Sequence, residues 1–142
     1  ANFSIDTATI ASGGTTSNFG QMTRNTRQVR GTSNSVRGMF FGGYSTYSPN
    51  AAEKHIDYIT IASTGNAFDF GDLMTVRAQS SCAANSTRAV AASGGGDPVG
   101  TVNSIEFVNI NTTGNAQDFG DLYNAVSAAY ACSDSGGGLG GF

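Results

Sequence analysis

The sequence predicts an all-β protein made of a unit that repeats about every 50 residues, and two observations carry this prediction. An apolar phrase that begins with Ile recurs at Ile5, Ile56 and Ile105, spaced by 51 and 49 residues. Gly accounts for 20 of the 142 residues and charged residues for only 12%, and segments rich in Ala, Leu, Glu and Lys, which favour long helices, are missing. We expect a single repeat domain over 1–142, because the chain is too short for two independent cores.

The rest of the unit repeats as well. Each copy continues into an acidic or amide residue followed by Phe and Gly, at 18–20, 69–71 and 118–120. Ser35–Gly43 aligns with Ser86–Gly95 apart from one extra residue, and Gly136–Phe142 occupies the same place in the last copy. These phases divide the chain into approximate units: a half unit at 1–22, a unit at 23–73, a unit at 74–122 and a half unit at 123–142.

Each unit is predicted to hold four short strands. In one unit they fall near Gln79–Ala84, at Arg88–Ala92, over Asn103–Ile110 and near Asp118–Leu122. Their β-branched and aromatic residues suit a pleated sheet. Thr113–Asn115 lies between the third and fourth strands, where Gly and Asn supply the positive φ of a tight hairpin. Four antiparallel strands in about 50 residues are typical of a β-propeller blade.

The order of these features resembles the kelch repeat. A Gly pair follows an apolar strand, an aromatic residue lies in the next strand, a second aromatic follows, and an Arg opens the next unit. The resemblance covers nearly the whole chain and implies kelch-like propeller blades of four antiparallel strands, three units per chain, with the terminal blade composite. Kelch units usually carry Trp where this chain has Phe19, Phe70 and Phe119. The residues that carry the resemblance are Gly42-Gly43, Gly94-Gly95, Tyr58, Phe107, Phe70, Phe119, Arg27 and Arg77.

A narrower resemblance concerns Ile56–Leu73. This segment is similar to repeats in virion structural proteins of tailed phages, especially marine cyanophages. The resemblance implies a structural component of a virion, either a capsid decoration or a tail or fibre protein, with other virion proteins as partners.

The phase of the repeat predicts assembly. The chain opens on the third strand of one unit and closes after the second strand of another, which gives three blade equivalents, whereas propellers have about four to eight blades. Two chains would give six blades with shared composite blades, three chains would give nine, and an open head-to-tail series would give a helical filament. A closed three-unit monomer is the alternative. We expect self-association as a dimer, a trimer or a head-to-tail polymer, because a lone arc would leave open sheet edges.

Charge is distributed unevenly along the chain. Residues 1–88 hold seven basic and five acidic residues, a net charge of +2, whereas 89–142 hold five acidic and no basic residues, a net charge of −5. Such asymmetry favours head-to-tail contact, and accidental clustering of few charges is the alternative. The acidic balance does not suit nucleic-acid binding, and no apolar run approaches the ~20 residues of a membrane-spanning helix. We expect neither nucleic acid nor a membrane as partner.

The carboxylates repeat with the unit. Equivalent positions supply like environments, whereas acid–base catalysis needs unlike ones, so we expect these acids to cap turns, to accept backbone N–H bonds or to pair with Arg. Arg27 and Arg77 are interpreted as one equivalent pair and Arg37 and Arg88 as another, bonding to carbonyls and carboxylates between units; a basic rim for an anionic partner is the alternative. The repeated acids are Asp6, Asp57, Glu106, Asp69, Asp118, Asp72 and Asp121.

No pattern in the sequence indicates catalysis. Cys82 and Cys132 are interpreted as matching positions 50 residues apart, and neither has the C-x-x-C partner that indicates a metal site. His55 is the only His, and no G-x-S-x-G motif accompanies it. We expect no enzyme activity, no catalytic residue, no cofactor and no metal.

Three residues around the longest loop, Gly43–His55, are candidates for contact with a partner or a glycan: Tyr44, Tyr47 and His55. Exposed Tyr on a loop suits sugar stacking or protein contact. Tyr44–Pro49 has no counterpart in Asp97–Gly100, whereas a lectin with one site per blade should carry equivalent loops.

The expected function is therefore that of a non-enzymatic structural component of a phage virion, located in the capsid or tail. The alternatives are a carbohydrate-binding propeller lectin or adhesin with a cell-surface glycan as partner, and a subunit of an extracellular filament.

Overall fold

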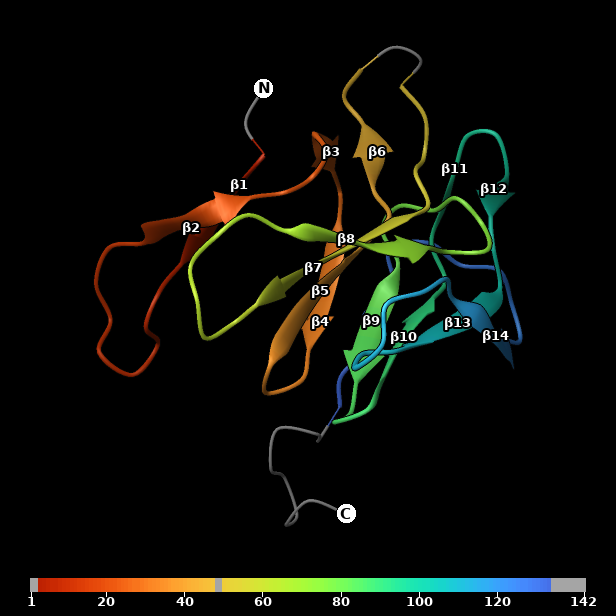
Figure 1. Ribbon diagram of the computed structural model, residues 1–142. Helices are drawn as coiled ribbons and strands as arrows, with labels where there is room; N and C mark the ends of the chain where they lie inside the picture. The colour runs from red at the N-terminus through yellow and green to blue at the C-terminus, as the bar shows by residue number, and fades with distance from the viewer. Residues whose placement is uncertain (1–2, 48–49, 134–142) are drawn as a thin grey trace.

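A computed structural model describes residues 3–47 and 50–133, and within these ranges the chain is all-β with no helix. Its strands form antiparallel sheets of two to four strands (Figure 1). The predicted all-β fold is confirmed, although the sheets of the described residues do not close into a barrel or a ring. The predicted copy of the repeat at Gly136–Phe142 lies outside the described residues.

Three sheets follow one another along the chain. The N-terminal sheet pairs β1 with β2, the middle sheet has the order β4-β5-β7-β8, and the C-terminal sheet has the equivalent order β9-β10-β13-β14. The bounds are β1 Ser4–Thr7, β2 Ser17–Gln21, β4 Arg30–Ser33, β5 Arg37–Phe41, β7 His55–Thr60, β8 Phe68–Asp72, β9 Ser81–Ala84, β10 Arg88–Ala92, β13 Ser104–Asn109 and β14 Gln117–Asp121.

Two further ladders of two-residue strands were not predicted. β3 (Thr26–Arg27) pairs with β6 (Tyr44–Ser45), and β11 (Gly95–Gly96) pairs with β12 (Gly100–Thr101). Such short segments, one of them all Gly, carry no alternation of apolar and polar residues by which a strand is recognised.

The third and fourth strands of each unit are not joined by a tight hairpin, and this expectation was wrong. The connection between β7 and β8 covers residues 61–67, and the one between β13 and β14 covers 110–116. Both connections reach across to the preceding sheet: the Gly65 N–H donates to the Phe19 carbonyl and the Gly114 N–H to the Phe70 carbonyl. A two-residue turn would be too short for this contact. We call 61–67, 110–116 and the corresponding segment 8–16 the bridging loops.

A β-bulge recurs at the same place in all three sheets. The register shifts between Ile5 and Asp6, between Ile56 and Asp57, and between Ile105 and Glu106. The unpaired extra residue on the opposite strand is Phe19, Phe70 or Phe119. A bulge leaves the extra residue out of the ladder and re-aims its neighbours, so the Phe carbonyl is available to the next unit.

The main core lies between the middle and C-terminal sheets. Met39 and Phe41 alternate on β5, Ala89 and Ala91 alternate on β10, and all four are buried in one cluster. Ile110, in the bridging loop of the C-terminal sheet, is also fully buried in this cluster. Because burial of apolar surface is the main stabilising term, each four-stranded sheet depends on its neighbour for its core.

Candidate functional site

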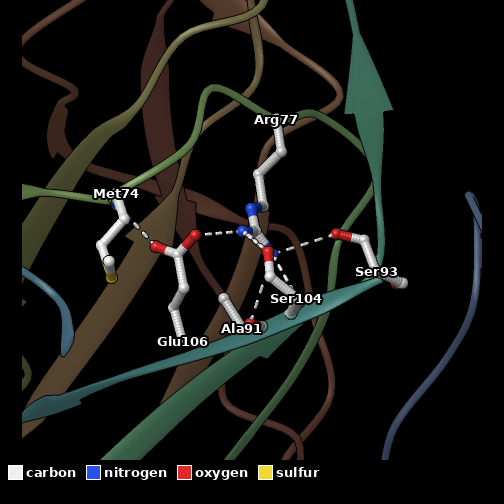
Figure 2. A network of polar contacts seen from close by, with 6 residues as sticks. All are labelled: Met74, Arg77, Ala91, Ser93, Ser104 and Glu106. Atoms are coloured by element: carbon white, nitrogen blue, oxygen red, sulfur yellow. Dashed lines mark hydrogen bonds and ion pairs between the residues drawn. The ribbon is translucent and has the colours of Figure 1, made fainter. Parts of the chain in front are cut away.

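The most buried polar group is a network around Arg77 and Glu106 (Figure 2). The Arg77 guanidinium donates to a Glu106 carboxylate oxygen, to the Ser104 carbonyl at 3.0 Å and to the Ser93 carbonyl at 3.3 Å. The other carboxylate oxygen of Glu106 accepts the Met74 N–H at 2.6 Å. Burial lowers the pKa of Arg77, and the adjacent Glu106 charge opposes that shift.

This network fastens the chain rather than exposing reactive groups. Arg77 has no exposed surface and Glu106 is 2% exposed, so a substrate cannot reach the pair in this conformation. The network ties the segment between β8 and β9 to β13 and to Ser93, directly after β10. Arg77 Nε is the one guanidinium nitrogen of this residue without a hydrogen-bond partner. A buried ion pair fixes geometry at little net gain in stability.

Asp57 repeats the role of Glu106 with a different partner. Its carboxylate accepts the Thr23 N–H at 3.0 Å and the Thr23 hydroxyl at 2.7 Å. Thr23 and Met74 directly correspond, since each follows the fourth strand of the preceding unit. The prediction that the repeated acids accept backbone N–H bonds is confirmed for Asp57 and Glu106.

Arg27 and Arg77 are not equivalent, so their assignment as a pair was wrong by one residue. Gln28 and Gln79 both have a positive φ, 59° and 57°, so they occupy the same position in the repeat. This alignment of the two units places Arg27 opposite Ala78 and not Arg77. The Arg27 guanidinium lies 5.7 Å from the centre of the Tyr44 ring, instead of in a buried ion pair.

Arg37 and Arg88 do occupy equivalent positions. Arg37 lies 4.7 Å from the centre of the Tyr58 ring and Arg88 lies 4.9 Å from the centre of the Phe107 ring. Arg37 also donates to the Ile110 carbonyl at 2.6 Å, so it bonds to a carbonyl of the next unit, as predicted.

His55 is not a loop residue, contrary to the expectation. It begins β7 opposite Asp72 of β8. Its Nδ1 lies 3.0 Å from an Asp72 carboxylate oxygen and its Nε2 lies 3.4 Å from one of Glu53. Lys54 Nζ lies 3.2 Å from the second Asp72 oxygen. The imidazole is therefore held between two carboxylates, because the bulged ladder brings Asp72 beside it.

The two candidate Tyr residues are placed differently. Tyr44 is in β6 and half-buried, and its hydroxyl accepts the Asp97 N–H at 3.2 Å, so it joins the middle and C-terminal units. Tyr47 is 64% exposed. It lines a shallow hollow of about 260 Å³ together with Arg24 and Glu53. Glu53 also contacts His55, so Tyr47 lies at a hollow whose lining residue Glu53 touches His55, whereas Tyr44 is not among the residues that line it.

The two Cys residues do not match in the repeat. With Gln79 aligned to Ala128, which has a φ of 54°, Cys82 aligns with Ala131. Burial raises the pKa of the Cys82 thiol to about 12 against the opposing charges of Arg30 and Arg77. Cys132 is exposed, and both thiols are free.

The bridging loops form the most regular contact in the molecule. Besides the Gly–Phe bonds, Ala67 donates to the Gln21 carbonyl and Ala116 to the Asp72 carbonyl, both at 2.8 Å. The side chain of Asn66 accepts the Gln21 N–H, and that of Asn115 accepts the Asp72 N–H. The same five-residue pattern therefore docks each complete unit on the unit before it.

Among residues 3–47 and 50–133, no three His, Cys, Asp or Glu side chains are grouped so as to hold a metal ion. The same ranges contain no helix long and apolar enough to cross a membrane. The chain matches no known protein family, and no curated protein sequence is significantly similar to it.

Proposed function

We propose that this chain is a non-enzymatic structural protein of a tailed-phage virion, in a capsid decoration or in a tail or fibre. Its units are kelch-like propeller blades, and the arrangement is completed by neighbouring chains. The proposal for the virion rests on the resemblance of Ile56–Leu73 to phage structural repeats.

One observation favours assembly above the others: the main core lies between sheets rather than within one sheet. A unit of this kind needs a neighbour on each side to cover its apolar surface. The polar groups support a structural rather than a catalytic role, because Arg77, Glu106 and Asp57 are buried and bonded inside the protein.

The first test is the native mass of the purified chain at micromolar concentration, measured at low and at high salt. We expect discrete oligomers or polymers, weakened by salt if the uneven charge contributes. A chain that stays monomeric at both salt concentrations would overturn self-assembly.

The virion location has its own test. Mass spectrometry of purified tailed-phage particles from a sample in which the sequence occurs should detect this chain in the particles. Its absence from the particles and presence in cell extracts would contradict the location.

The hollow beside Tyr47 favours a second candidate, binding of a cell-surface glycan. An exposed aromatic ring with Arg24 and Glu53 nearby offers a stacking surface and polar groups of both charges. A glycan array with the unmodified chain and with Tyr47→Ala tests it: binding that depends on Tyr47 supports the candidate, and no binding by either protein removes it.

A further inference from the structure

The contact between units is repeated twice inside the chain, and its two halves are left uncovered at opposite sides of the described structure. In Figure 1 the β1–β2 hairpin with its bridging loop lies on the left, and β14 lies on the right. The internal contacts show which groups belong together, so each uncovered half can be compared with its covered counterparts.

The contact between the middle and C-terminal units has an apolar part. Ile110 of the bridging loop is fully buried, and Phe70 of the preceding unit is 3% exposed. Arg37 of that preceding unit closes the contact by donating to the Ile110 carbonyl. Phe19, the counterpart of Phe70, is likewise only 8% exposed beneath the next bridging loop. Ile61, the counterpart of Ile110 in the first contact, is 43% exposed, because the N-terminal sheet of the described residues has only β1 and β2 and lacks strands equivalent to β4 and β5.

The outer face of the C-terminal sheet has the receiving half of this contact. Phe119, the third copy of the bulged Phe, is 56% exposed, and Tyr123, the counterpart of Thr23 and Met74, is fully exposed. A hollow of about 390 Å³ beside Phe119 is lined by Arg88 and Val90, which correspond to Arg37 and Met39.

The glycine that follows the bulged Phe also distinguishes the two covered contacts from the uncovered receiving half. A Cβ at Gly20 would lie 1.9 Å from the Gly65 carbonyl oxygen, and one at Gly71 would lie 2.4 Å from the Gly114 carbonyl oxygen. A Cβ at Gly120 would meet nothing within 4 Å in the described structure. The first two glycines are required by a docked loop, and the third occupies the same position without one.

The first bridging loop, 8–16, has the inserting half. Ile10, the counterpart of Ile110, is 97% exposed. Asp6, the counterpart of Asp57 and Glu106, is exposed, although the other two are buried. Gly14, with a φ of 112°, stands where Gly65 and Gly114 donate their N–H groups.

We propose that the inserting half of one chain docks on the receiving half of a second copy, head to tail. Ile10 fills the hollow beside Phe119, and its carbonyl accepts from Arg88. The Gly14 N–H donates to the Phe119 carbonyl. Asp6 accepts the Tyr123 N–H. This inference rests on the proposed self-assembly and specifies the surface that carries it.

The two halves are unlike surfaces. The inserting half, within 1–22, has Asp6 as its one charged residue, whereas the receiving half includes Arg88. The surface is therefore heterologous, so a chain that loses one half can still use the other.

The test compares Ile10→Asp with Val99→Asp by native mass and sedimentation at micromolar concentration. Both residues are exposed, at 97% and 44%, so neither change should alter folding of the single chain, which circular dichroism checks. Ile10→Asp removes the apolar side chain that fills the hollow and places a hydrated carboxylate against Val90 and Phe119, so it should weaken association about 30-fold or more, as loss of an interface hot spot does. Val99→Asp, between β11 and β12, should leave association unchanged.

A mixing experiment tests the direction of the contact. Phe119→Asp, or Arg88→Glu if the first variant loses stability, blocks the receiving half. We expect each blocked variant to be monomeric alone. A mixture of Ile10→Asp with the receiving-half variant should give a dimer and nothing larger, because one intact half remains on each chain.

The outcomes separate this inference from the proposed function. An unmodified chain that is monomeric overturns both. An unmodified chain that assembles while Ile10→Asp assembles equally well overturns the docking surface alone. Variants that are monomeric separately and remain so when mixed overturn the head-to-tail direction.

Discussion

At the scale of single residues, one buried charge pair sets how a connecting segment is held. The prediction that Glu106 accepts a backbone N–H bond and that Arg77 bonds to carbonyls and a carboxylate is confirmed, but these partners of Arg77 lie in its own unit and not in a neighbouring one. The equivalence of Arg27 and Arg77 was wrong because the two look alike in the sequence. Only the shared backbone conformation of Gln28 and Gln79 shows that their positions in the repeat differ by one residue.

We predict that Glu106→Gln lowers the free energy of unfolding by about 3 kcal/mol, because it leaves the Arg77 charge buried without a counter-charge. Urea unfolding measures this. Asp57→Asn is the matched control at the equivalent position, where the partner is Thr23 and no buried Arg is left behind, and should cost about 1–2 kcal/mol. Equal losses for the two variants would contradict a special role for the ion pair.

A double variant separates the pair from its surroundings. Arg77→Met with Glu106→Leu should be less destabilised than Glu106→Gln alone, because apolar residues of similar size can replace a buried ion pair at small cost.

The two Cys residues should differ in reactivity. Because burial raises the pKa of Cys82 to about 12, its reactive thiolate is scarce in the folded chain, so iodoacetamide at pH 8 should modify Cys132 rapidly and Cys82 slowly. Peptide mass spectrometry reads both sites, and urea should remove the difference. The raised pKa also stabilises the fold below the unfolded thiol pKa of about 9, and this contribution is lost as the pH rises towards 12. Equal labelling in the native chain would contradict this.

At the scale of elements, the strands were more predictable than their connections. β10 begins and ends as predicted, and β9, β13 and β14 lie close to their predicted ranges, because alternating residues between Gly-rich segments leave little choice. The sequence predicts tight hairpins where the bridging loops lie, because a Gly–Asn pair has the same local backbone preference in both. What decides their length is the contact with the preceding sheet, which involves residues more than 40 positions away.

In the candidate site too, local features could be predicted from the sequence, whereas contacts with distant residues could not. Tyr47 is exposed, as its loop position predicted. The prediction placed His55 in the loop because the sequence does not mark where the loop ends and β7 begins. Its two carboxylate neighbours are Glu53, two residues earlier, and Asp72 of the opposite strand. A one-residue bulge, which shifts that pairing, leaves no signal of its own in a single copy.

The bridging contact itself can be tested at the bulge. Gly71 and Gly120 have φ values of 149° and 142°, so Ala at either position meets similar backbone strain, but only at Gly71 does a Cβ collide with a docked loop. Gly71→Ala should therefore be less stable than Gly120→Ala by about 2 kcal/mol in urea unfolding at concentrations where the chain is monomeric. Equal stability of the two variants would show that the loop does not need glycine beneath it.

At the scale of the whole molecule, the position of the core makes the units interdependent. The middle sheet contributes Met39, Phe41 and Phe70 to a cluster whose other side comes from the C-terminal sheet. A fragment of residues 23–73 keeps all four strands of its sheet but loses the surface that covers this cluster.

We therefore predict that residues 23–73 alone do not fold, whereas residues 23–133, which keep both sides of the cluster, unfold cooperatively. Repeats of this kind are stabilised mainly by their interfaces with neighbours. Two-dimensional NMR of the short fragment should show poorly dispersed amide signals, and thermal unfolding of the longer one should show a single transition. Well-dispersed signals from residues 23–73 would mean that one sheet is stable alone, and the physical reason for assembling further copies would then be lost.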